Sequence, residues 1–132
     1  MVLGGTLRYL DTDMRLVGQF KPGTADRPIE EYHSDDRLLE LADQALNDLN
    51  IHHIVGIIAT GNYFVDDPQK VEQVIRETGA DAVEMEGAAV AHVAARNDVP
   101  ALVIRALSDN ADTDYEDFKR STFPNTRTPP RN

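Results

Sequence analysis

The fold of this chain is decided by the stretch from Ala80 to Asp112, which reads ADAVEMEGAAVAHVAARNDVPALVIRALSDNAD. Short apolar runs at 82–85 and 101–107 are typical of buried strands, and the alanine-rich run 87–96 between them favours a helix packed closely on a sheet. A strand, a helix and another strand in this order predict a parallel pair whose carboxyl ends lie side by side at one edge of the sheet. Ligands bind at that edge in open α/β folds.

Strands and helices alternate through the rest of the chain. Ser34, followed by two acids, is expected to cap a helix in which leucine and alanine recur with helical spacing from Leu38 to Leu49. Asp67 and Pro68 predict the start of a second helix, and Gly79 predicts its end. The expected fold class is therefore α/β: a partial three-layer arrangement with a central, mostly parallel or mixed sheet flanked by helices. The remaining predicted segments are a strand or hairpin arm at 6–17, a loop at 19–33, a buried strand at 54–59 and the start of a helix at 115–121.

A chain of 132 residues is long enough for one domain, which we assign to residues 1–121. The tail 122–132 combines prolines with threonine, asparagine and arginine, and such a segment cannot bury enough apolar area to order itself. We therefore expect the tail to be disordered.

Composition argues against several classes of function. The 13 basic and 23 acidic residues give a net charge of −10, which disfavours binding to a nucleic-acid backbone. No apolar run approaches the ~20 residues that span a bilayer, and no signal peptide is evident at the start. The chain has no cysteine, so disulfides and thiol chemistry are excluded. These features predict a cytoplasmic protein that binds neither nucleic acid nor a membrane.

Two acids, Glu84 and Glu86, stand where the first of these strands runs into the alanine-rich helix. Residues two apart on a strand point to the same side, and two carboxylates on one side repel each other unless they are solvated or bound by a donor-rich ligand. A ribose diol supplies such donors. The alternative is that Glu86 caps the helix, where the dipole favours an acid. Spacing alone does not choose between the two.

Arg105 and Asp109 bracket the end of the last predicted strand. An arginine within an apolar strand needs a carboxylate partner, and Glu84 or Glu86 on the neighbouring strand is the obvious candidate. Asp109 is suited to act on a purine ring as a general acid, which requires partial burial. The alternative is that Ser108 and Asp109 only cap the following turn.

Other motifs are less specific. Gly61 lets the backbone approach a ligand closely and Phe64 offers a ring for stacking on a flat base, but both are also common in ordinary turns and cores. No phosphate-binding glycine loop occurs. The four histidines form no metal-ligand pattern, so no metal site is expected.

Four segments carry a resemblance to a known family: LRYLDTD at 7–13, TGNYFV at 60–65, AVEMEGAAVAHVA at 82–94 and NDVPALVIRALSDNAD at 97–112. Together they resemble the 5′-methylthioadenosine/S-adenosylhomocysteine nucleosidases of the nucleoside phosphorylase superfamily. The resemblance implies hydrolysis of the bond between adenine and a 5′-thioribose, with a small nucleoside as substrate, no metal or organic cofactor, and a homodimer in which 14–19 reaches the neighbouring subunit's site.

The resemblance also assigns roles to individual residues. It implies that Asp109 protonates or hydrogen-bonds the purine and that Glu86 binds the ribose hydroxyls, with Met85 against the sugar. Glu84 and Arg105 match positions that orient the attacking water. The remaining substrate-binding candidates are Phe64 and Val65, which match positions that stack on adenine and bond its edge, and Ser108.

Family members carry a substantial region before the position of Thr6, including an acid that activates water, and their last helix continues where this chain has a proline-containing tail. Many also have aspartate where Asn62 stands. We therefore expect a truncated nucleosidase with impaired activity. The alternatives are a purine nucleoside phosphorylase of the same superfamily and a non-catalytic fragment that binds adenosine or dimerises.

Overall fold

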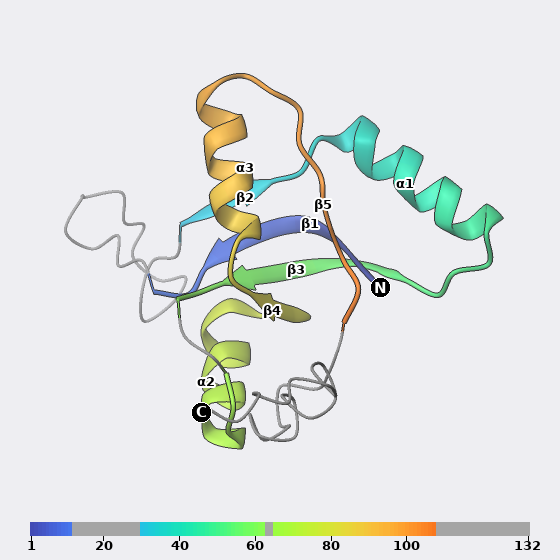
Figure 1. Ribbon diagram of the computed structural model, residues 1–132. Coiled ribbons are helices and arrows are strands. Elements are labelled where there is room, and N and C mark those ends of the chain that lie inside the picture. The colour runs from blue at the N-terminus through green and yellow to red at the C-terminus, as the bar shows by residue number, and fades with distance from the viewer. Residues whose placement is uncertain (12–29, 63–64, 108–132) are drawn as a thin grey trace, which may run out of the picture.

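The computed structural model describes residues 1–11, 30–62 and 65–107. Within these residues the chain forms five strands and three helices (Figure 1). In chain order they are β1 (Val2–Tyr9), β2 (Glu31–His33), α1 (Asp36–Asp48), β3 (Ile54–Thr60), α2 (Pro68–Thr78), β4 (Ala82–Glu84), α3 (Gly87–Arg96) and β5 (Val103–Arg105). The predicted helix start at 115–121 and the predicted disordered tail at 122–132 lie outside the described residues.

The strands form one mixed sheet in the order β2-β1-β3-β4, and β5 also pairs with β1. The pairs β1–β3 and β3–β4 are parallel, whereas β1–β2 and β1–β5 are antiparallel. A sheet of this kind flanked by helices confirms the predicted α/β class. None of the helices in the described ranges is long and apolar enough to cross a membrane.

The predicted parallel pairing of the strand at 82–85 with the strand at 101–107 is wrong. β5 is antiparallel to β1, on the far side of β3 from β4. The reason lies in the short β2, which pairs only with Thr6–Arg8 and leaves the outer edge of Val2–Gly4 free. β5 takes that edge. Local periodicity predicts a strand but not its neighbour.

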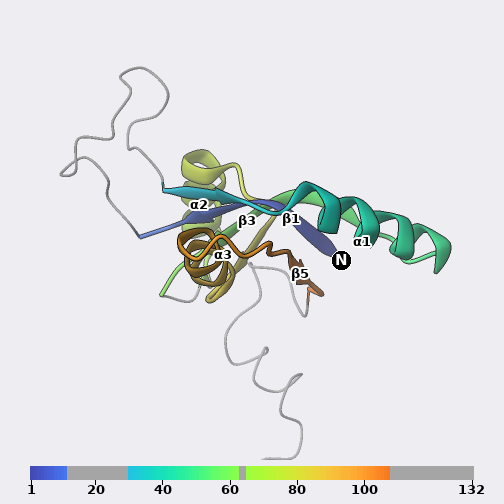
Figure 2. The same ribbon diagram turned by 90° about the horizontal axis from the view of Figure 1, so that it is seen from above.

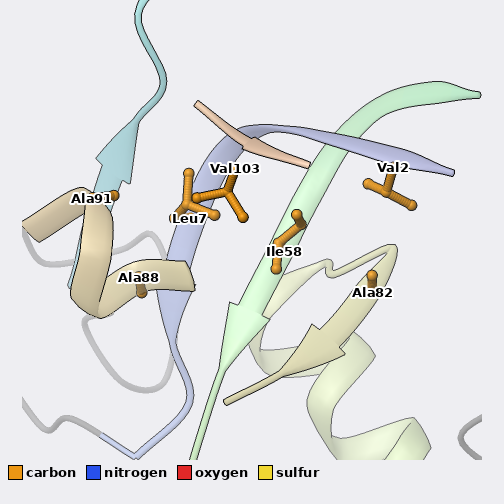
Figure 3. Close-up of a cluster of buried hydrophobic side chains, with 7 residues drawn as sticks. All are labelled: Val2, Leu7, Ile58, Ala82, Ala88, Ala91 and Val103. Carbon is orange, nitrogen blue, oxygen red and sulfur yellow. The ribbon is translucent and has the colours of Figure 1, made fainter. Parts of the chain in front are cut away.

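Two apolar clusters, one on each face of the sheet, form the core. Ile58 and Ala59 are fully buried neighbours on β3, and alternation sends them to opposite faces. α3 covers the Ile58 face and α2 covers the Ala59 face (Figure 2). The first cluster comprises Val2, Leu7, Ile58, Ala82, Ala88, Ala91 and Val103 (Figure 3), and the second comprises Leu10, Ala59, Val65 and Val74.

Burial differs along β3, which was expected to be buried throughout. Ile54 and Val55 are 44% and 51% exposed, whereas the strand is buried from Ile58 to Thr60. The difference arises because β4 pairs only with Ile58–Thr60 and so leaves the first half of β3 at an edge.

Helix α2 begins and ends as predicted. Asp67 accepts the Lys70 N–H at 2.9 Å, Pro68 occupies the first turn, and Gly79 closes the helix with a left-handed φ of 66°. This conformation favours glycine.

Helix α1 is confirmed, but its predicted cap is wrong. Asp35, not Ser34, is the N-cap, and its Oδ1 accepts the Leu38 N–H at 2.9 Å. The Ser34 hydroxyl is buried and donates instead to the carbonyl oxygen of Gly4, which holds the start of the helix against the sheet. No residue of α1 is buried, so the apolar stripe of this helix is at most partly covered.

The predicted first strand starts earlier than expected, at Val2, and the described part ends at Tyr9. The predicted loop at 19–33 contains β2 at its end. Glu31–His33 lacks the proline and glycine that mark the earlier part of that stretch, and it pairs with Thr6–Arg8 through backbone hydrogen bonds. Glu31–His33 contains no apolar run, unlike the stretches that contain β4 and β5, so the sequence gives no strand signal there.

Candidate active site

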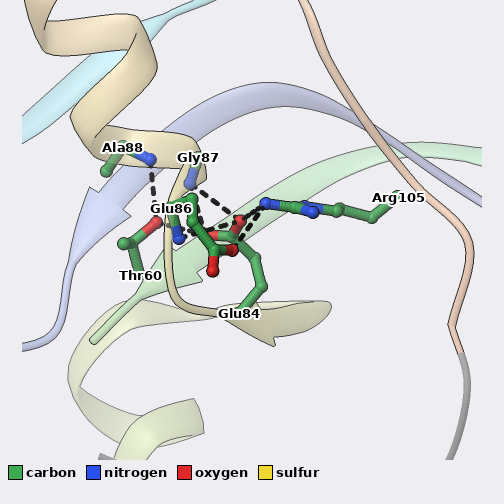
Figure 4. Close-up of polar contacts among 6 residues, drawn as sticks. All are labelled: Thr60, Glu84, Glu86, Gly87, Ala88 and Arg105. Carbon is green, nitrogen blue, oxygen red and sulfur yellow. Dashed lines mark hydrogen bonds and ion pairs between the residues drawn. The ribbon is translucent and has the colours of Figure 1, made fainter. Parts of the chain in front are cut away.

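The candidate site lies where β3 and β4 end and α3 begins. Thr60 and Glu84 are paired neighbours on these strands, and the Gly61 N–H donates to the Glu84 carbonyl oxygen at 3.1 Å. β4 passes directly into α3, so the carboxylate of Glu84 sits beside the free N–H groups of the helix (Figure 4).

Glu84 caps helix α3 from the strand that precedes it. Its two carboxylate oxygens accept the Gly87 N–H at 2.8 and 2.7 Å, and Oε2 also accepts the Glu86 N–H at 3.3 Å. Glu86 occupies the N-cap position, but its side chain makes no capping hydrogen bond. The alternative in which Glu86 caps the helix is therefore wrong.

Arg105 joins the two acids, as predicted. Its Nη2 donates to Glu84 Oε2 and to Glu86 Oε2, the latter at 3.0 Å (Figure 4). The guanidinium neutralises one of the two negative charges and offsets their repulsion. β5 and β4 are not neighbours, because β1 and β3 lie between them. The long side chain of Arg105 therefore crosses the α3 face of the sheet to reach Glu84 at the end of β4 (Figure 4).

The two glutamates differ in their exposure. The side chain of Glu84 is 10% exposed and accepts from several donors, whereas that of Glu86 is 67% exposed. The Nε of Arg105 is buried without a hydrogen-bond partner among the described residues. Glu84 is thus committed to holding the site together, and Glu86 presents its carboxylate to solvent, where a ligand with hydroxyl donors could bind it.

Of the other predicted site residues, Met85 and Val65 lie within the described ranges and differ in exposure. Met85, between the two glutamates, is 47% exposed. Val65 is 7% exposed and packs in the α2-side cluster, so its side chain serves the core, while its predicted contact with adenine involves the backbone. Phe64, Ser108 and Asp109 lie outside the described residues, and their roles stay predictions.

The interpretation of Gly61 changes with the structure. A Cβ at this position would lie 2.8 Å from Leu10 Cδ1 and 3.1 Å from Leu10 Cβ. The glycine therefore makes room for a buried leucine, and this packing explains it without a ligand. Its neighbour Asn62 donates from N and from Nδ2 to Asp11 Oδ2, at 3.1 and 2.9 Å. This amide ties the chain after β3 to the chain after β1.

Sequence reasoning missed Thr60. This residue is 3% exposed, and its hydroxyl donates to Glu84 Oε1. Thr60 Oγ1 also accepts the Ala88 N–H at 2.8 Å. The sequence feature that could have indicated this role is a polar residue at the end of an apolar strand, directly before a glycine.

An aromatic cluster next to the site was also missed. The rings of Tyr32 and His92 stack with centroids 4.7 Å apart, and Tyr9 meets both edge-on. Burial, followed by the hydrogen bond to Glu30, raises the pKa of Tyr32 to about 12. Across the described ranges, no group of three histidine, aspartate or glutamate side chains is arranged to hold a metal ion.

Residues 6–127 match the phosphorylase superfamily. The chain belongs to this superfamily. Its resemblance to one branch is also confirmed: it is 37% identical over 117 residues to the 5′-methylthioadenosine/S-adenosylhomocysteine nucleosidase of Tolumonas auensis, a match that covers 86% of this chain and 50% of the relative.

Solved structures agree with this assignment. A mutant of the Helicobacter pylori nucleosidase with 5′-methylthioadenosine in its active site superposes with a TM-score of 0.72 at 33% identity, covering 84% of this chain and 48% of that one. The futalosine hydrolase of the same organism gives a TM-score of 0.71 at 34% identity, covering 84% and 47%. The chain spans about half the length of the curated relatives it matches.

Proposed function

We propose that the chain provides the nucleoside site of a 5′-methylthioadenosine/S-adenosylhomocysteine nucleosidase, which hydrolyses the N-glycosidic bond and releases adenine and a 5-thioribose. The observation that carries this proposal is the Arg105-bridged pair of Glu84 and Glu86 at the carboxyl end of β4. Glu84 is held by several donors, whereas Glu86 is 67% exposed, so the Glu86 carboxylate can accept hydrogen bonds from a diol. The names of the relatives support the choice of substrate.

In this proposal the exposed carboxylate of Glu86 accepts hydrogen bonds from the ribose hydroxyls, and Met85 lies against the sugar. Negative charge at this place also stabilises the positive charge that develops on the ribose as the bond to adenine breaks. Glu84 holds Arg105 in place, and through this pair the site orients the water. The oxygen of that water bonds to the anomeric carbon as the carbon–nitrogen bond breaks, and Asp109 supplies the proton that adenine takes as it leaves. The proton that the water loses passes to solvent, from which Asp109 is protonated again.

The remaining parts of the proposal are substrate contacts and assembly. Phe64 stacks on adenine, the backbone of Val65 bonds its edge, and Ser108 lines the substrate site. A homodimer is proposed from the family resemblance, and the exposed apolar side chains of α3, Val90 and Val93, are consistent with a further contact surface. The cytoplasmic location expected from the sequence stays a prediction.

Adenine release from 5′-methylthioadenosine by the purified chain tests this function, with Asp109→Asn as the inactive control. A parallel assay that measures release of the purine base from futalosine compares the two activities for which the structural relatives are named. Adding phosphate separates hydrolysis from phosphorolysis, because only a phosphorylase forms 5-methylthioribose 1-phosphate from this substrate. Stabilisation by the nucleoside without any adenine release would instead favour a non-catalytic adenosine-binding fragment.

A further inference from the structure

We propose that Thr60 is a positioning residue for the candidate site, acting through Glu84 on Arg105. The proposal deepens the proposed nucleosidase function and rests on it. It starts from a buried hydroxyl that contacts two elements of the site at once, although the side chain itself is too deep to meet a ligand.

The hydrogen bonds of Thr60 fix the direction of its hydroxyl proton. Oγ1 accepts the Ala88 N–H at 2.8 Å, so the one proton of the hydroxyl is directed away from α3 and donated to Glu84 Oε1. The helix terminus thereby determines which way the threonine donates.

Glu84 in turn has little freedom to move. Oε1 accepts from Thr60 and Gly87, while Oε2 accepts from Gly87, Glu86 and Arg105. Loss of the Thr60 donor would let the carboxylate turn about its last bond toward the remaining donors. Arg105 Nη2, which is shared with Glu86, would then move with it.

The cross-strand register explains why this position suits the role. Thr60 pairs with Tyr9 on one side and with Glu84 on the other, at the last row of the sheet before the loops. The backbone of Thr60 is paired with a strand on each side, and this pairing fixes the place from which its hydroxyl reaches Glu84.

Three variants test the proposal. Thr60→Val removes the hydroxyl and keeps the shape, and Thr60→Ser keeps the hydroxyl. Thr78→Val is a matched control, because Thr78 is also buried, at 1% exposure, and its hydroxyl likewise donates once, to Val74 O at 2.7 Å, and accepts once, from Ala80 N at 3.1 Å. That threonine lies at the end of α2, outside the site.

The first readout is the NMR signal of the Arg105 Nε–H group in the full chain. Thr60→Val is expected to shift it and to speed its exchange with water, whereas Thr60→Ser and Thr78→Val leave it unchanged. The second readout is adenine release, where Thr60→Val is expected to lower kcat by about tenfold to a hundredfold with KM nearly unchanged. Serine at this position should restore kcat.

The two proposals fail in different ways. If the parent chain neither binds the nucleoside nor releases adenine, the proposed function is wrong, and the Arg105 signal alone decides whether Thr60 positions the site. If Thr60→Val behaves like Thr78→Val in the Arg105 signal, or if serine does not restore what valine removes, the positioning role is wrong.

Discussion

Glu84 accepts the backbone N–H of Gly87 on both of its carboxylate oxygens, at 2.8 and 2.7 Å. A strand residue therefore caps the helix that follows it, three residues along the chain. The same carboxylate bonds Arg105 and Thr60, so helix capping and the geometry of the site depend on a single side chain.

Replacing Glu84 by glutamine should destabilise the fold, because a neutral amide caps a helix less well and leaves Arg105 with a weaker partner. We expect the free energy of unfolding in urea to fall by about 1–3 kcal/mol. Glu86→Gln is the matched control, and its exposed carboxylate should contribute less than about 0.5 kcal/mol. Equal losses in the two variants would contradict the assignment of the cap to Glu84.

Gly87→Ala should also destabilise the chain, although alanine usually favours a helix. A Cβ at this position would lie 3.0 Å from both carboxylate oxygens of Glu84, which several donors hold in place. We expect a loss of about 1–3 kcal/mol from this overpacking, measured by urea unfolding. The control Ala89→Gly, at an exposed position of the same helix, should cost no more than about 1 kcal/mol. A Gly87→Ala variant at least as stable as the parent would show that Glu84 moves freely.

Stability should depend on the protonation of His53. Its Nδ1 lies 2.7 Å from the Ile51 carbonyl oxygen and its Nε2 lies 2.8 Å from Asp43 Oδ1, so both ring nitrogens face acceptors. The Ile51 carbonyl, and then Asp43, raise the pKa of His53. A raised pKa in the folded state stabilises the fold fully below the unfolded value of about 6.5, and this contribution is lost as the pH rises through the folded pKa.

Urea unfolding measured from pH 5.5 to 9 checks this expectation. His53→Gln should remove the part of the pH dependence that lies above about pH 6.5. His52→Gln, at the exposed neighbouring position, should leave it in place. An unchanged pH profile in His53→Gln would mean that the histidine does not hold α1 to the start of β3.

Tyr32 should ionise later than an ordinary tyrosine. Burial and the hydrogen bond to Glu30 raise its pKa to about 12, so absorbance titration of the folded chain should show one tyrosine component near that value. Tyr32→Phe should remove this component and leave the others. If the late component persists in the variant, it belongs to another tyrosine.

The sequence predicts those parts of the fold that local patterns specify. Asp67, Pro68 and Gly79 bound α2 as expected because caps and proline act within one turn. The pairing of Arg105 with the two glutamates followed from the energetic need of a partly buried charge for a partner. The bounds of α2 require no knowledge of strand order. The expected pairing of Arg105 assumed that its strand neighbours β4, and the contact exists although β5 pairs with β1.

The missed features depend on contacts distant in the sequence. β5 was placed beside the wrong strand because its neighbour is set by how much of the β1 edge the three residues of β2 cover. Thr60 was missed because its hydroxyl acquires a role only when Glu84 and Ala88 are brought to it. Ser34 is a typical N-cap residue, but its hydroxyl donates a hydrogen bond to the Gly4 carbonyl oxygen and so does not cap the helix.

The most direct test of the central claim, that Glu86 is the open carboxylate which binds a ribose, is calorimetric binding of a non-hydrolysable analogue of 5′-methylthioadenosine. Because hydrogen bonds to a charged group are involved, Glu86→Gln should weaken binding by about tenfold to a hundredfold. The control Glu72→Gln, an exposed acid on α2, should bind like the parent. Equal affinity in the parent, Glu86→Gln and Glu72→Gln would contradict the account.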